Sequence, residues 1–172
     1  MMQLLTSQRE DSLARIIREH PFLAGMNGAH LEVLRECAMR TTFARGSLIF
    51  REGDLANRFY LIESGRVALE LRNEDGRPPT RVQELHAGDA LGWSWLFPPY
   101  YWHYNAHALT RTTAIFFYGT RLRNECEEDH SFGYELMKRM AAVAIQRLEA
   151  HRAKLPPTHL VVRRKWSSRV AN

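Results

Sequence analysis

The chain has 172 residues, of which 45% are hydrophobic and 25% are charged, as is typical of one globular domain with a buried core. The net charge of +5 permits nucleic acid as a partner without requiring it, and no apolar run approaches the roughly 18 residues that a membrane span needs. The N-terminal residues lack the pattern of a signal peptide, and two cysteines without a CxxC pair form no disulfide framework, so we expect a reducing, cytoplasmic setting.

The first 38 residues carry two predicted helices. Ser7-Gln8-Arg9-Glu10 matches a capping box, and the helix that follows should end near His20, because Pro21 disfavours helical geometry in the residue before it. Asn27 is the expected N-cap of the second helix. The buried side of that helix is expected to consist of Leu31, Leu34, Cys37 and Ala38. Cys37 is thus expected to be a core residue rather than a reactive thiol.

From Thr41 the hydrophobic period shortens to that of β-strands, and glycines separate the apolar runs. In Arg66–Leu71, alternate residues are apolar, and Asn73–Gly76 has the composition of a hairpin turn. Turn signals about every ten residues predict an antiparallel sandwich or barrel. The expected strands are Ser47–Phe50, Phe59–Glu63, Arg66–Leu71, Thr80–Leu85 and Thr112–Phe117.

The last structured part is expected to hold a short helical piece, Arg121–Cys126, and a long helix from about Ser131 to Leu155. The long helix carries two apolar stripes. One consists of Leu136, Met140 and Val143. The other has the spacing of a coiled-coil seam and consists of Met137, Ala141, Ala144, Leu148, His151 and Leu155. We expect one face on the β-barrel and the other on the same helix of a second subunit; the alternative is that both faces pack within one chain.

Pro156-Pro157 ends this helix, and residues 156–172 form a basic tail that includes Arg163, Arg164 and Lys165. A short basic tail is usually solvated or flexible. It is too short to fold as a helix-turn-helix module. We therefore expect no direct sequence-specific DNA binding from this chain.

Aromatic residues are concentrated in Gly88–His107, which holds three of the four Trp and three of the six Tyr. Glycines and Pro98-Pro99 break this segment, so it fits neither a plain helix nor a plain strand. Ligand pockets are mostly apolar and aromatic with a few polar groups, which makes the segment a candidate binding site. The alternative is that its rings simply cap a core.

The run Ala44–Glu70 resembles the cyclic nucleotide-binding domain of the bacterial catabolite-activator/fumarate-nitrate-regulator (Crp/Fnr) superfamily. The resemblance continues in Leu85–Gly92 and covers about residues 20–155. It is carried by Gly46, Ile49-Phe50, Gly53-Asp54, Phe59-Tyr60-Leu61-Ile62, Ser64-Gly65 and Val67.

The resemblance implies an α+β, mainly β fold: an antiparallel jelly-roll barrel with N-terminal helices and a long C-terminal dimerisation helix. Residues 1–155 would then form one domain, with N-terminal helices in 7–38, the jelly roll in 41–118 and C-terminal helices in 121–155.

The resemblance also implies that a phosphate-binding cassette follows Leu91-Gly92, in which a short helix directs its N-terminal amides at a cyclic phosphate. In the family a Glu binds the ribose, and an Arg followed by Ser or Thr pairs with the phosphate. Here the Glu position falls on Trp93. The Arg and Ser positions fall on Tyr104 and Asn105 with one inserted residue, and without the insertion the Arg position falls on His103.

Two long-helix positions that reach the base in the family fall on His151 and Arg152. The ligand-binding residues that the resemblance implies are thus Leu91, Gly92, Trp93, Ser94, Trp95, Tyr104, Asn105, Ala106, His151 and Arg152. Without the Arg, cyclic phosphate binding should weaken by about one to two orders of magnitude or more. Arg111 and Arg152 are candidate substitutes.

These features predict a regulatory sensor module of bacterial signalling or transcription regulation, without catalysis. It would form a homodimer, bind a small molecule in the barrel pocket and signal through the dimer helix. The candidate ligand is a cyclic nucleotide or a flatter, less charged molecule. The alternatives are a ligand-free dimeric scaffold whose own rings fill the pocket, and an accessory protein of a transcription regulator. We expect no membrane association and no metal site, although His86, His103 and His107 would be the histidines to inspect.

Overall fold

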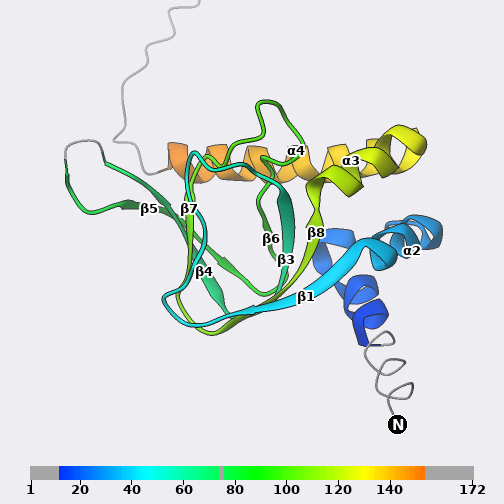
Figure 1. Cartoon of the computed structure of the whole chain (residues 1–172), viewed down its shortest axis with the longest axis horizontal. Helices are drawn as coiled ribbons and strands as arrows, with labels where there is room; N and C mark the ends of the chain where they lie inside the picture. The colour runs from blue at the N-terminus through cyan, green and yellow to red at the C-terminus, as the bar shows by residue number, and fades with distance from the viewer. Residues whose placement is uncertain (1–11, 74–75, 154–172) are drawn as a thin grey trace, which may run out of the picture.

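The computed structural model describes residues 12–73 and 76–153, in which two four-stranded antiparallel sheets are accompanied by helices (Figure 1). The predicted capping box at Ser7–Glu10, the seam residue Leu155 and the basic tail lie outside these residues, and so does the side chain of His151.

The N-terminal helices are arranged as their capping residues predict. Residues 12–19 are helical and His20 is not, as expected before Pro21. His20 instead caps the short helix η1 (Pro21–Leu23), where its Nδ1 accepts a hydrogen bond from the Phe22 N–H at 3.2 Å. Helix α2 (Gly28–Cys37) begins after Asn27, whose Oδ1 accepts from the His30 N–H at 2.8 Å. The predicted N-cap is confirmed.

The C-terminal end of α2 differs from the prediction. Cys37 is buried, as expected, and burial raises the pKa of its thiol. Ala38, which the helical pattern assigned to the buried helix face, instead begins strand β1 (Ala38–Phe43). The reason is tertiary: Ala38 pairs with Phe117, and this register continues through the whole of β1. Sheet pairing outweighs the local helix signal.

The strands form two sheets, and all their pairings are antiparallel. The first sheet has the order β1-β8-β3-β6, with β3 (Arg58–Ser64), β6 (Ala90–Leu91) and β8 (Thr112–Tyr118). The second has the order β2-β7-β4-β5, with β2 (Leu48–Phe50), β4 (Arg66–Leu71), β5 (Thr80–His86) and β7 (Asn105–Ala108). The predicted fold, an antiparallel β-barrel with flanking helices, is confirmed.

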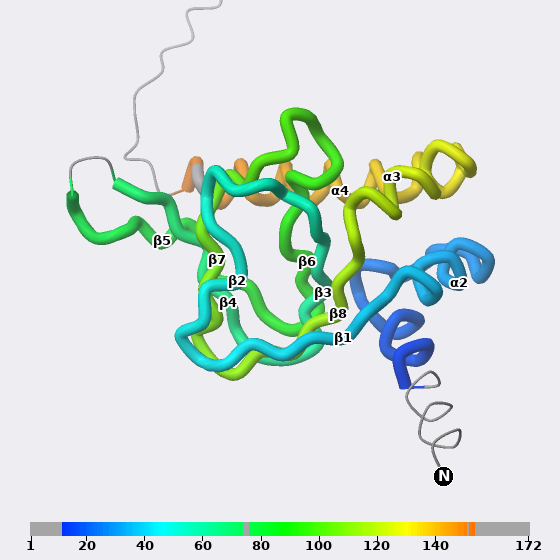
Figure 2. Tube along the Cα trace, viewed as in Figure 1, coloured from blue at the N-terminus to red at the C-terminus, as the bar shows by residue number. Residues whose placement is uncertain are grey.

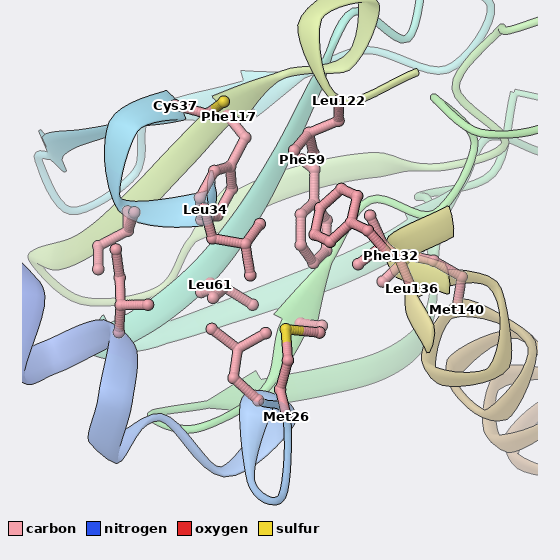
Figure 3. Close-up of a cluster of buried hydrophobic side chains, with 14 of the residues drawn as sticks. Met26, Leu34, Cys37, Phe59, Leu61, Phe117, Leu122, Phe132, Leu136 and Met140 are labelled. Atoms are coloured by element: carbon pink, nitrogen blue, oxygen red, sulfur yellow. The ribbon is translucent and has the colours of Figure 1, made fainter. Parts of the chain in front are cut away.

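The central strands of the first sheet, β3 and β8, are buried on both faces, and their side chains alternate between the second sheet and the helices. Tyr60, Ile62 and Phe116 face the second sheet and form the core between the sheets. Their neighbours Phe59, Leu61 and Phe117 face the helices. Figure 3 shows these three with side chains of α2 and of the C-terminal helix, including Leu34, Cys37, Phe132, Leu136 and Met140.

Two helices follow the barrel: α3 (Gly119–Glu128) and the long α4 (His130–Arg152). The Asp129 carboxylate between them accepts hydrogen bonds from the N–H groups of Ser131 and Phe132 at 2.9 and 3.1 Å, which caps α4. Leu136 and Met140 are fully buried in the helix-side core, so the predicted inner stripe is confirmed. Helix α4 runs across one end of the sheets and reaches β5 (Figures 1 and 2). None of the helices in the described part of the chain has the length and apolar character that a bilayer crossing requires.

Candidate functional site

The aromatic segment between β6 and β7, residues 92–104, forms the candidate site. It contains turns and bends and no helical residue, so the short cassette helix that the resemblance implied is absent from this segment. A physical reason lies in its sequence. Prolines 98 and 99, joined by a cis peptide bond, have no N–H to donate to a helix, and Trp95 is drawn into the core.

The three tryptophans of the segment occupy different places. Trp95 is 0% exposed, and its ring centroid lies 5.9 Å from that of Phe59 in the helix-side core. Trp102 is buried against Phe50, with ring centroids 3.8 Å apart and planes within 10°. Trp93 is half-buried and stacks on His103 at 4.7 Å. The rings of Trp95 and Trp102 are thus buried against other side chains of the same chain.

Contacts between the start and the end of the segment hold its two ends together. Gly92 has φ +86°, and a Cβ added to it would lie 2.7 Å from Cζ3 of Trp102. Only glycine therefore fits there without movement of the indole. The Oγ of Ser94 lies 2.9 Å from Nδ1 of His103, which adds a polar contact between the same two ends.

The segment is also tied to the connection between β2 and β3. The Ala56 N–H donates to the Tyr100 carbonyl at 2.6 Å, and the Trp102 N–H donates to the Asp54 carbonyl at 2.9 Å. The Arg123 Nη1 of α3 donates to the carbonyl of Trp95 at 2.5 Å from the other side. The segment is therefore held by both the barrel and α3.

Residues at the start of β7 have structural contacts of their own. The Oδ1 of Asn105 accepts from the Glu52 N–H at 3.0 Å, and Asn105 lines a groove of about 650 Å³ together with Arg51, Glu52 and Arg72. Tyr104 is half-buried against the core between the sheets. Burial raises the pKa of its hydroxyl, which nearby Arg147 partly offsets, so the phenol is a neutral hydrogen-bond donor at neutral pH.

Sequence reasoning missed Arg147, which α4 places beside this segment. Its side chain is 3% exposed, and its Nη2 donates to the carbonyl of Ala90 at 2.6 Å. Ala90 lies two residues before Gly92, so the guanidinium sits at the start of the segment. Burial lowers the pKa of Arg147 to about 10, which leaves it charged at neutral pH. The spacing of Leu136, Met140, Val143 and Arg147 is 4-3-4, the signal that would have put Arg147 on the buried stripe.

The two candidate substitutes for the missing cassette Arg lie elsewhere. Arg152 is exposed. Arg111 is also exposed and lines a separate groove of about 740 Å³ between the helical residues 12–19 and strands β1 and β8. Neither predicted residue therefore supplies a charge at the segment. The positive charges there come from Arg123, which donates to the Trp95 carbonyl, and from Arg147, which donates to Ala90 just before the segment.

The three histidines noted in the sequence have separate partners. The Nε2 of His86 lies 3.4 Å from Glu84, and Nδ1 of His107 lies 3.2 Å from Glu70, while His103 contacts Ser94. In residues 12–73 and 76–153, no three His, Cys, Asp or Glu side chains are grouped as a metal site would require.

The second apolar stripe of α4 faces away from the core. Met137 is 42% exposed and Leu148 is 69% exposed, while Ala141 and Ala144 are partly exposed. Ile145, beside the stripe, is 57% exposed.

The fold of the chain is similar to that of several solved structures. A protein from Geobacter metallireducens GS-15, named as a cyclic nucleotide-binding protein, is 27% identical, with 78% of this chain and 96% of that chain covered and a TM-score of 0.70. The N-terminal domain of a transcriptional regulator from Streptomyces coelicolor A3(2) is 24% identical, with 84% and 98% covered and a TM-score of 0.62. The regulatory domain of Toxoplasma gondii PKA, crystallised with cAMP, is 20% identical, with 83% and 51% covered and a TM-score of 0.66.

Comparison with curated proteins returns no match. The sequence profile of the cyclic nucleotide-binding domain matches residues 40–129, more than half of the chain. This match, together with the barrel and its helices, shows that the chain belongs to the cyclic nucleotide-binding domain family.

Proposed function

We propose that this chain is a ligand-responsive regulatory domain that acts as a homodimer and performs no catalysis. The observation that carries the proposal is the division of α4 into two faces. Its inner face contributes Leu136, Met140 and the buried Arg147. Its outer face exposes Met137 and Leu148. A ligand that displaces the β6–β7 segment or Arg147 would move the helix that carries the outer face.

The outer face supports pairing with a second copy of the chain. Large apolar side chains in a stripe of coiled-coil spacing are costly to leave in water. Pairing of two such helices about a two-fold axis would bury the stripe, and this symmetry is the commonest among homo-oligomers.

We propose that the ligand differs from cAMP and cGMP, or that the chain binds these two nucleotides weakly. The fold accommodates cAMP in the Toxoplasma gondii regulatory domain. In this chain Trp93 and Tyr104 stand where the resemblance places a Glu and an Arg, and neither side chain supplies their charges at neutral pH. We therefore expect the ligand site of this chain to use other side chains than the Glu and Arg that the resemblance implies.

A second candidate function, a ligand-free dimeric scaffold, is favoured by the close contact between the two ends of the segment. Trp102 covers Gly92, and Trp95 is part of the core. In that case α4 would still pair, and the segment would only add stability.

The dimer is tested by sedimentation equilibrium of the wild-type chain, Leu148→Glu and the control Gln146→Glu. Gln146 is exposed on α4 outside the stripe and receives the same charge change. We expect dimers for the wild type and the control, and a monomer for Leu148→Glu. A monomeric wild type at tens of micromolar would overturn the dimer.

Ligand response is tested on the same proteins by thermal shift with cAMP, cGMP, AMP and adenosine. A compound at 100 times its dissociation constant should stabilise the fold by about 2.7 kcal/mol. A wild-type dimer that responds to no compound would favour the scaffold over the sensor.

A further inference from the structure

We propose that Arg147 is the charge-bearing residue of an anion site between α4 and the β6–β7 segment, and that it takes the phosphate or carboxylate of a small ligand. The inference rests on the proposed ligand-binding function and specifies the chemistry of the ligand. Its basis is a buried cation that no carboxylate among the described residues contacts.

Buried arginines are normally paired with a carboxylate, because an uncompensated charge is costly to remove from water. In the described part of the chain, no carboxylate lies within 4 Å of the Arg147 nitrogens. Its hydrogen bond goes to a neutral acceptor, the carbonyl of Ala90, and its Nε has no partner among the described residues. A bound anion would supply the direct ion pair that Arg147 does not form with a described residue.

Arg139, two turns earlier on α4, shows what a structural arginine looks like in this protein. It too donates to neutral carbonyls, those of Phe22 at 2.8 Å and Ala24 at 3.0 Å, and it too leaves its Nε without a partner among the described residues. The difference is the carboxylate of Glu135, which lies 3.8 Å from Arg139. Arg139 thus has a carboxylate within 4 Å, whereas Arg147 has none among the described residues.

The surroundings of Arg147 suit an anion. Its guanidinium contacts Ala90 at the start of the segment, and the Tyr104 hydroxyl at the far end lies within electrostatic range of it. The Asp89 carboxylate attracts Arg147 electrostatically but forms no ion pair with it, and it accepts a hydrogen bond from the His86 N–H at 2.7 Å. Arg147 and the Tyr104 hydroxyl, near the two ends of the segment, are thus within electrostatic range of each other. A phosphate or a carboxylate fits this chemistry.

The test is calorimetric titration of the wild type, Arg147→Met and the matched control Arg139→Met with AMP, cAMP, adenosine and inorganic phosphate. We expect the wild type and the control to bind AMP, and Arg147→Met to bind AMP at least about tenfold more weakly. Adenosine, which has no charge, should bind the three proteins alike. Arg147→Lys keeps the charge without the planar fork and should fall between the wild type and Arg147→Met.

Several results would overturn the assignment. Equal AMP binding by the wild type and Arg147→Met would show that Arg147 does not hold the anion. Loss of binding in Arg72→Met alone would put the anion in the groove with Arg51 and Arg72. Either result would leave the proposed ligand-binding function intact. Failure of the wild type to bind any probe would overturn both the assignment and that function.

Stability without ligand separates a ligand-binding from a structural role. Removal of an uncompensated buried charge should leave the melting temperature of Arg147→Met unchanged or raised. If both Arg147→Met and Arg147→Lys melt well below Arg139→Met, then Arg147 is a structural tie between α4 and Ala90, and the inference is wrong.

Discussion

Gly92 shows how one backbone position shapes the candidate site. Its φ of +86° is strained for other residues, and an added Cβ would lie 2.7 Å from the Trp102 indole. We expect Gly92→Ala to lower the free energy of unfolding by roughly 1–3 kcal/mol and to push Trp102 off Phe50. Denaturant unfolding followed by tryptophan fluorescence measures both effects.

Gly46→Ala is the matched control. Gly46 has nearly the same φ, +83°, and an added Cβ there meets nothing within 4 Å. It therefore carries the backbone cost alone. If Gly92→Ala costs no more than Gly46→Ala, the close contact between Gly92 and Trp102 does not hold.

His20 makes stability depend on pH. Its burial lowers its pKa below the ordinary value of about 6.5. Its Nδ1 accepts from the Phe22 N–H, which protonation would prevent, and its Nε2 lies 3.3 Å from the Ile62 carbonyl. The unfolded chain therefore binds more protons between the folded pKa and about 6.5. Stability is complete above this window and falls as the pH is lowered through it.

The measurement is the free energy of unfolding from pH 7.5 to 5 for the wild type and His20→Gln. Glutamine cannot be protonated in this range, so the slope in the variant should be shallower even if its overall stability is lower. Parallel curves for the two proteins would show that His20 is not the group responsible.

At the scale of elements, the two faces of α4 predict opposite costs for the same substitution. Leu136 is fully buried, whereas Leu148 is 69% exposed. Leu136→Ala should lower the free energy of unfolding by about 2–5 kcal/mol, because it leaves a cavity in the helix-side core. Leu148→Ala should change it by no more than about 0.5 kcal/mol in dilute, monomeric protein. Equal losses measured by chemical denaturation would mean that the assignment of faces is wrong.

The strands differ in how well local sequence predicts them. Strand β4 has the predicted bounds because Val67 and Leu69 alternate with other residues between two turns. For strand β7 the sequence predicts only a β-region somewhere after Pro98-Pro99, without bounds, since Asn-Ala-His-Ala has no β-branched residue and no Phe, Tyr or Trp. Its extended form comes from pairing with β2 and β4 on either side, which no local window contains.

The sequence indicates where the candidate site lies, but not how its side chains are arranged. Aromatic density marks the segment, yet composition does not say that Trp95 enters one core while Trp102 stacks on Phe50. Arg147 escaped notice because an arginine on a helix is usually assigned to solvent. Its apolar stripe was visible, but only the closure of α4 over the barrel turns that position into a buried cation.

At the scale of the whole molecule, α4 links the candidate anion site to the proposed dimer face. Arg147 and Leu148 are adjacent on the same helix, one buried and the other exposed. If AMP favours one position of α4, it changes the dimer constant, and dimerisation must change AMP affinity by the same factor. A coupling free energy of about 1.4 kcal/mol corresponds to tenfold in each direction.

This reciprocity gives the last prediction. Titrations of the wild type with AMP above and below its dimer constant should give different affinities, and the monomeric Leu148→Glu should match the dilute wild type. Sedimentation with saturating AMP should then shift the dimer constant by the factor found in the titrations. Different affinities without that shift would violate linkage and point to a third state. Identical affinities at both concentrations would mean that ligand and dimer are independent, so that α4 carries both faces but transmits nothing between them.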